Sequence, residues 1–182
     1  MPSLNDGAKV AGMASASTRQ AVEQRLRELS AKAGEALQSR GDRLAAAESC
    51  TGGWIAKVVT DIPGSSAWFD RGFVTYSNEA KQDMLGVRQA TLQAHGAVSE
   101  AVVREMAEGA LANSRATVTV SVSGVAGPGG GTEAKPVGRV WMAWAREGGE
   151  TQARCFDFEG DRDAVRCQAV MAGLEGVREM LR

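Results

Sequence analysis

The fold is decided by residues 117–123 (TVTVSVS), which run directly into the glycine-rich residues 124–131 (GVAGPGGG). Apolar and polar residues alternate strictly along the first stretch, with Val118, Val120 and Val122 on one side and hydroxyl side chains on the other. Successive side chains of a β-strand point to opposite faces of its sheet, so this pattern predicts a strand. The glycines predict a flexible loop at its carboxyl end.

Helical and strand patterns alternate on both sides of this stretch. Upstream, we expect helices over residues 19–37, 54–60 and 79–85 and after Ser99, and strands over residues 44–47 and 73–76. Downstream, residues 140–145 and 154–158 read as strands joined through Gly148 and Gly149, which is typical of an antiparallel hairpin. A last helix is expected to start near Asp161.

This order of elements predicts an α/β fold, a three-layer α/β/α sandwich. Its mixed sheet should have about five strands, with a C-terminal antiparallel hairpin and flanking helices. We expect residues 19–182 to form a single domain and residues 1–18, which are small and polar, to form a loose tail. Binding sites in such sheets lie beyond the carboxyl ends of strands. Ser49, Tyr76 and the glycine loop each follow a predicted strand, so we expect them to converge.

Composition argues against several classes of partner. The 21 basic and 22 acidic residues give a net charge of −1, which does not suit nucleic acid as the main partner. No apolar run approaches the roughly 18 residues that a membrane helix needs, and the first residues lack the apolar core of a secretory signal. Three cysteines without metal-like spacing and a single histidine favour a cytoplasmic protein without a disulfide framework or a metal site.

Residues 48–53 (ESCTGG) lie between a predicted strand and a predicted helix. Backbone N–H groups at such a position can hold an anion or an oxyanion, which makes Ser49 a candidate nucleophile. The residues that follow it, Cys50, Thr51, Gly52 and Gly53, are candidate binding residues. Cys50 is a rival nucleophile, because helix N-termini lower thiol pKa values. The alternative is that a hydroxyl here only caps the helix and the glycines only allow close packing.

A serine nucleophile needs a base, and the only histidine, His95, is expected simply to end a helix. A lysine can act as the base if burial lowers its pKa. Lys81 follows the only tyrosine, Tyr76, by five residues, and Ser49, Lys81 and Tyr76 together would be sufficient for a hydrolase. The alternative is a surface tyrosine and a solvated lysine, which are the usual cases.

The glycine loop could bind a phosphate. It is neither a Walker motif nor a dinucleotide fingerprint, yet the amides of Gly127, Gly129 and Gly130 could cradle a phosphate or allow a flat ring to approach. Ser123 could face the same cavity. Arg162 and Arg166, near the start of the last helix, are candidates to bind a phosphate or carboxylate. A plain connecting loop is the alternative.

Seven segments in combination resemble the CinA C-terminal domain family. These are residues 47–53 (AESCTGG), 63–69 (PGSSAWF), 72–81 (GFVTYSNEAK), 95–99 (HGAVS), 123–131 (SGVAGPGGG), 135–138 (KPVG) and 160–166 (GDRDAVR). The likeness runs from about Leu26 to the C-terminus. Because 182 residues leave no room for the larger N-terminal domain of full-length CinA proteins, the chain resembles the stand-alone form.

The resemblance implies hydrolysis of the carboxamide of nicotinamide mononucleotide, a small-molecule substrate, without a cofactor. It also implies that Ser49 is the nucleophile, that Lys81 and Tyr76 activate it, and that the protein forms a homo-oligomer, most plausibly a dimer. Two alternatives stay open. One is a catalytically silent nucleotide-binding or interaction module, and the other is an amidase that uses Cys50 with Glu48 and Lys81.

Overall fold

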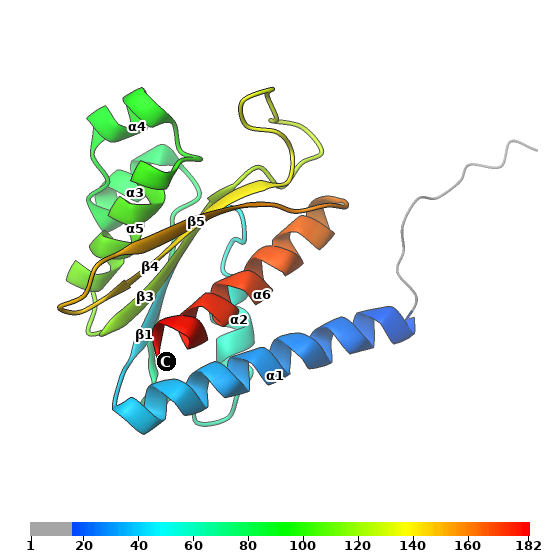
Figure 1. Cartoon of the computed structure of the whole chain (residues 1–182), viewed down its shortest axis with the longest axis vertical. Helices are drawn as coiled ribbons and strands as arrows, with labels where there is room; N and C mark the ends of the chain where they lie inside the picture. Colours follow the sequence, from blue (N-terminus) through cyan, green and yellow to red (C-terminus); the bar gives the residue numbers. More distant parts are fainter. Residues whose placement is uncertain (1–15) are drawn as a thin grey trace, which may run out of the picture.

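A mixed five-stranded sheet with the strand order β2-β1-β3-β4-β5 runs through the middle of the molecule (Figure 1). This computed structural model describes residues 16–182. The strands are β1 (Leu44–Glu48), β2 (Phe69–Val74), β3 (Val118–Gly124), β4 (Arg139–Arg146) and β5 (Gln152–Asp157). β1 pairs in parallel with β2 and β3, whereas β4 is antiparallel to β3 and β5. The predicted C-terminal hairpin is therefore formed by β4 and β5.

Two layers of helices cover the faces of the sheet (Figure 1). One face packs against α1 (Ala16–Arg40), α2 (Trp54–Thr60) and α6 (Arg162–Met180). The other packs against α3 (Asn78–Leu85), α4 (Gln89–His95) and α5 (Glu100–Ala112), and a short 3₁₀ turn, η1 (Ser65–Ala67), precedes β2. The predicted three-layer α/β/α architecture is confirmed.

The central strand β3 is buried on both faces. Its valines pack in the core beneath α1, α2 and α6, as an alternating strand requires. Its hydroxyl side chains face α5, where Thr119 Oγ1 donates to the Ala107 carbonyl at 2.8 Å and Ser121 Oγ donates to the Val103 carbonyl at 2.6 Å. These hydrogen bonds satisfy polar groups that would otherwise be costly to bury.

Several elements differ from the sequence prediction. α1 begins at Ala16, inside the predicted tail of residues 1–18, and the rest of that predicted tail lies outside the described residues. β2 covers Phe69–Val74 and not residues 73–76, and of α4 only its end at His95 was predicted. β2 is an edge strand in which only Phe73 is buried, so its sequence carries little periodicity.

The loop between β3 and β4, residues 125–138, is closed at its base by two backbone hydrogen bonds. Val125 N–H donates to the Arg139 carbonyl at 2.9 Å, and Gly138 N–H donates to the Val125 carbonyl at 2.8 Å. Further out, the Arg139 guanidinium donates to the Ala134 carbonyl at 2.9 Å. The loop projects from the carboxyl end of β3 (Figure 1). No helix within residues 16–182 is long and apolar enough to cross a membrane.

Candidate active site

A cavity of about 270 Å³ lies at the carboxyl ends of the parallel strands. It is lined by residues that follow β1 and β2, by α3, by the segment before α5, by the end of β3 and by the start of α6: Ser49, Cys50, Tyr76, Asn78, Lys81, Ala97, Val98, Ser123, Gly124, Ala126 and Arg162. The segments after the three strands were predicted to meet here. The fold therefore brings together residues that are far apart in the sequence.

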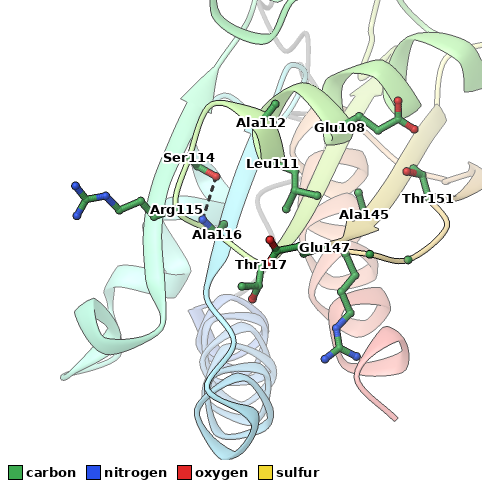
Figure 2. Close-up of a pocket in the computed structure, with 13 residues that line it drawn as sticks. Glu108, Leu111, Ala112, Ser114, Arg115, Ala116, Thr117, Ala145, Glu147 and Thr151 are labelled. Atoms are coloured by element: carbon green, nitrogen blue, oxygen red, sulfur yellow. Dashed lines mark hydrogen bonds between the residues drawn. The ribbon is translucent and has the colours of Figure 1, made fainter.

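A larger hollow of about 570 Å³ lies at the opposite end of the sheet (Figure 2). It is bordered by the C-terminal part of α5, with Glu108 and Leu111, and by the turn between β4 and β5, with Glu147. The hydrogen bond drawn there joins Ser114 Oγ to the Ala116 amide within one turn. Among the described residues that line it, no nucleophile contacts a basic side chain, so the chemistry points to the smaller cavity.

Ser49 and Lys81 are in direct contact in the smaller cavity. Lys81 Nζ lies 3.0 Å from Ser49 Oγ and also donates to the Thr75 carbonyl at 2.8 Å. The lysine side chain is almost fully buried, with 1% of the residue exposed. It projects from α3, which begins with a Ser77 cap that accepts from the Ala80 amide at 3.0 Å. The Lys81 amine is thus buried and fixed by hydrogen bonds, and it is not a solvated side chain.

Burial lowers the pKa of Lys81, since removing an ammonium from water disfavours its charged form. The negative charge of an ionised Cys50 would act in the opposite direction, and its effect is the smaller one. A larger fraction of neutral amine is then present near neutral pH than for an ordinary lysine. A neutral amine 3.0 Å from Ser49 Oγ is in position to accept the serine proton.

Tyr76 lines the same cavity but contacts neither partner. Its hydroxyl accepts a hydrogen bond from Arg162 Nη2 at 3.1 Å, and 63% of the residue is exposed. Arg162 Nη1 donates to the Gly127 carbonyl at 2.9 Å, so this arginine connects the tyrosine to the β3–β4 loop. Within residues 16–182, no hydrogen bond joins the Tyr76 hydroxyl to Ser49 or Lys81. Its predicted activating role stays a prediction.

Glu48, the last residue of β1, is fully buried, and its carboxylate lies at the beginning of α2. Its carboxylate accepts hydrogen bonds from the amides of Gly53 at 3.1 Å, Ile55 at 3.0 Å and Ala56 at 2.9 Å. The amide of Gly52 is also engaged and donates to the Ser49 carbonyl at 3.1 Å. The amides of Gly52 and Gly53, which the sequence offered for anion binding, are therefore already used inside the protein.

The expectation that Cys50 has an activated thiol is wrong. Burial raises the pKa of Cys50 to about 11, although its backbone amide and Arg166 act to lower it. The desolvation of the thiolate is the largest cause of the raised pKa, and the negative charge of Glu48 raises it further. At neutral pH this thiol is protonated and a poor nucleophile.

The remaining predicted binding residues divide into two groups. Cys50, Ser123 and Arg162 line the cavity, and Ser123 Oγ donates to the Ala97 carbonyl at 2.8 Å. The cavity lining does not include Thr51, Gly52, Gly53, Gly127, Gly129, Gly130 or Arg166. Arg166 instead donates to the carbonyls of Cys50 and Thr51. A guanidinium with these internal partners is less suited than Arg162 to meet a ligand.

Sequence reasoning missed several residues that line the cavity. Ala97, Val98, Gly124 and Ala126 carry no reactive group, so only the fold reveals them. Asn78 could have been found from its place between Tyr76 and Lys81 at the start of the predicted helix. His95 ends α4 as expected and is exposed. Residues 16–182 contain no group of three or more His, Cys, Asp or Glu side chains placed to hold a metal ion.

Comparison with known proteins identifies the family. The family model described as the CinA C-terminal domain matches residues 26–181. The nicotinamide-nucleotide amidohydrolase PncC of Escherichia coli K12 is 62% identical over 150 residues, which cover 82% of this chain and 91% of that protein. PncC of Enterobacter agglomerans is 55% identical over 161 residues, covering 88% and 98%.

A solved structure has the same fold. The competence/damage inducible protein CihA from Agrobacterium tumefaciens is similar with a TM-score of 0.85 and 43% identity, over 87% of this chain and 96% of that one. The family model spans most of the chain, and the first relatives are matched over nearly their whole length. This chain therefore belongs to the CinA C-terminal domain family.

Proposed function

We propose that this chain hydrolyses the carboxamide of nicotinamide mononucleotide to nicotinate mononucleotide and ammonia, with Ser49 as nucleophile and neutral Lys81 as its base. The observation that carries the proposal is the 3.0 Å contact between Ser49 Oγ and the buried Lys81 amine. The chain is an amidohydrolase by its family relationships, and its 62% identity to a nicotinamide-nucleotide amidohydrolase supports the substrate.

The reaction divides into two proton-balanced halves. Lys81 Nζ accepts the Ser49 proton as Ser49 Oγ bonds to the carboxamide carbon, and the resulting ammonium returns that proton to the departing nitrogen, which leaves as ammonia. Lys81 then deprotonates a water molecule that attacks the acyl ester. The proton passes back to Ser49 Oγ as the ester bond breaks. The positively charged pyridinium ring of the substrate favours the neutral form of Lys81, since nearby like charges disfavour protonation.

Arg162 is the group best placed to bind the substrate phosphate. It lines the cavity, and among the described residues no carboxylate pairs with its guanidinium, which donates only to the neutral oxygens of Gly127 and Tyr76. Arginine binds phosphate through several parallel N–H groups. A phosphate on Arg162 would compete for the bond to Tyr76 and so release the tyrosine hydroxyl for proton transfer.

The nucleotide is expected to extend beyond the cavity. The volume of the cavity, about 270 Å³, is just below roughly 300 Å³, the lower end of the range for pockets that enclose a small molecule. We infer that the carboxamide enters towards Ser49 while the ribose phosphate lies near the rim, where Tyr76 is exposed.

Ammonia release from nicotinamide mononucleotide tests the proposal. The wild type should release ammonia, and Ser49→Ala should lose several orders of magnitude in kcat while still binding the mononucleotide. Cys50→Ser should keep the reaction, because the Cys50 thiol is protonated at neutral pH. A wild type that binds the nucleotide without releasing ammonia would mean a silent binding module. An active Ser49→Ala together with an inactive Cys50→Ser would mean a cysteine amidase.

A further inference from the structure

Arg166 of α6 holds the turn that carries Ser49. Its Nε donates to the Cys50 carbonyl at 3.1 Å, and its Nη2 donates to the Thr51 carbonyl at 3.0 Å. The guanidinium lies over the Trp54 ring, 5.2 Å from the ring centroid, and its Nη1 is 3.6 Å from Asp163 Oδ1. This arginine touches the two residues that follow the nucleophile without lining the cavity.

The bonds at these carbonyls also orient amide groups. The carbonyl and the amide of one planar trans peptide point in opposite directions. Arg166, which holds the Cys50 carbonyl, therefore fixes the direction of the Thr51 N–H. In the same way, the bond from Gly52 N–H to the Ser49 carbonyl, at 3.1 Å, fixes the Cys50 N–H. Within residues 16–182, neither the Cys50 amide nor the Thr51 amide donates to the backbone of another residue.

These two amides belong to the residues that directly follow the nucleophile, and their hydrogens are not taken by the backbone of another described residue. The amides of Gly53, Ile55 and Ala56 are bound by the Glu48 carboxylate and are not available, and the amide of Trp54 donates to the Thr51 carbonyl. In a turn closed from its fourth residue to its first, the amide of the third residue, here Thr51, can approach the side chain of the first residue, here Ser49, and the Cys50 amide adjoins the same residue. A carbonyl oxygen attacked by Ser49 Oγ would meet donors at that position. Such fixed donors stabilise an oxyanion without having to reorganise.

We propose that Arg166 is a positioning residue for the amidase reaction. By holding the Cys50 carbonyl it orients the Thr51 amide directly, and by holding the Thr51 carbonyl it steadies the Gly52 amide, whose bond to the Ser49 carbonyl orients the Cys50 amide. Both amides are thereby kept directed at the oxyanion that forms on attack by Ser49. The inference rests on the proposed function. Loss of one oxyanion donor costs about 10²–10³ in kcat, and loosening two donors without removing them should cost about 10- to 100-fold. KM should stay nearly unchanged, because the negative charge exists only after attack.

The test compares Arg166 with a second arginine that also lies over a tryptophan. Arg154 is 5.6 Å from the centroid of the Trp144 ring and pairs with Glu179 at 2.7 Å, but it does not contact the Ser49 turn. We expect Arg166→Met to lower kcat for nicotinamide mononucleotide about 10- to 100-fold with KM changed by less than about threefold. Arg166→Lys, which cannot bind both carbonyls in the same geometry, should be intermediate. Arg154→Met should keep kcat.

Chemical rescue separates positioning from simple packing. Methylguanidinium at millimolar concentration should raise the kcat of Arg166→Met by occupying the space over Trp54, and it should not affect Arg154→Met. The inference is overturned if Arg166→Met has the kcat of Arg154→Met, or if its kcat is low and is not rescued. If Arg166→Met does not fold, the kcat of Arg166→Lys decides in the same way. An active Ser49→Ala would overturn the proposed function itself, whereas an inactive Ser49→Ala beside a fully active Arg166→Met overturns only this inference.

Discussion

Replacing Glu48 by Gln should destabilise the fold strongly, although the two side chains have nearly the same size. One carboxylate oxygen, Oε2, accepts from Gly53 and Ile55, and the other, Oε1, accepts from Ala56. In the best orientation the glutamine oxygen keeps two of these bonds and its NH₂ group faces the Ala56 amide. That buried amide then lacks an acceptor, which costs about 1–3 kcal/mol.

The two bonds that remain also weaken. Hydrogen bonds to a neutral oxygen contribute about 1 kcal/mol less than those to a charged one, while burial of a neutral amide in place of a carboxylate offsets part of the loss. We therefore expect Glu48→Gln to lower the free energy of unfolding by about 2–4 kcal/mol. For a chain of this length that lowers the melting temperature by about 4–16 °C.

Thermal unfolding followed by far-ultraviolet circular dichroism measures the effect. Glu28→Gln is the matched control, because Glu28 is an exposed residue of α1 that accepts one side-chain hydrogen bond from Gln24. That control should stay within about 0.5 kcal/mol of the wild type. If Glu48→Gln also stays within that range, the three bonds do not stabilise α2 as argued.

Four further outcomes follow from the structure. Burial lowers the pKa of Lys81, so the unfolded chain binds more protons than the folded one between that lowered value and 10.5. The free energy of unfolding should therefore rise with pH in this window. In melting experiments at several pH values, Lys81→Met should lack this rise. Below the lowered pKa, the kcat of the wild type should fall with decreasing pH as Lys81 is protonated. Arg162→Ala should raise KM about 10- to 100-fold for nicotinamide mononucleotide and have little effect for nicotinamide riboside, which lacks the phosphate. A Cβ at Gly109 would lie 1.9 Å from the Leu85 carbonyl oxygen, so Gly109→Ala should cost about 1–3 kcal/mol by denaturant unfolding, whereas Gly149→Ala, with its nearest contact at 3.5 Å, should be nearly neutral.

The elements that could be predicted are those with strong local signals. The alternation in β3 identified a buried strand, and the caps Ser77, Ser99 and Asp161 stand where the sequence indicated the starts of α3, α5 and α6. Gly86 ends α3 in the left-handed conformation, with a φ of 67°, that glycine adopts readily. Such signals depend only on neighbouring residues, so one sequence is enough to find them.

The elements that escaped prediction depend on distant contacts. α4 is seven residues long and buries only Thr91 and Leu92, which is too few for a periodic pattern. The same reason explains the shift of β2, an edge strand with one buried residue. The candidate site likewise has features that could be predicted from local signals and features that could not. The convergence of Ser49, Tyr76 and Lys81 on one cavity follows from the order of the strands, but the burial of Lys81 and the internal bonds of Glu48 and Arg166 follow from packing between elements.

The two hydrogen bonds at the base of the β3–β4 loop make the conformation of the loop independent of the strand pairing in the sheet. Because Val125 and its partners Gly138 and Arg139 close the base, insertions or deletions within residues 126–137 need not change the pairing of β3 with β4. The loop is still connected to the cavity, because Arg162, which lines the cavity, donates to the Gly127 carbonyl. Variation in this segment can thus shift the Gly127 carbonyl, and with it the Arg162 guanidinium that lines the cavity, while the scaffold keeps its shape.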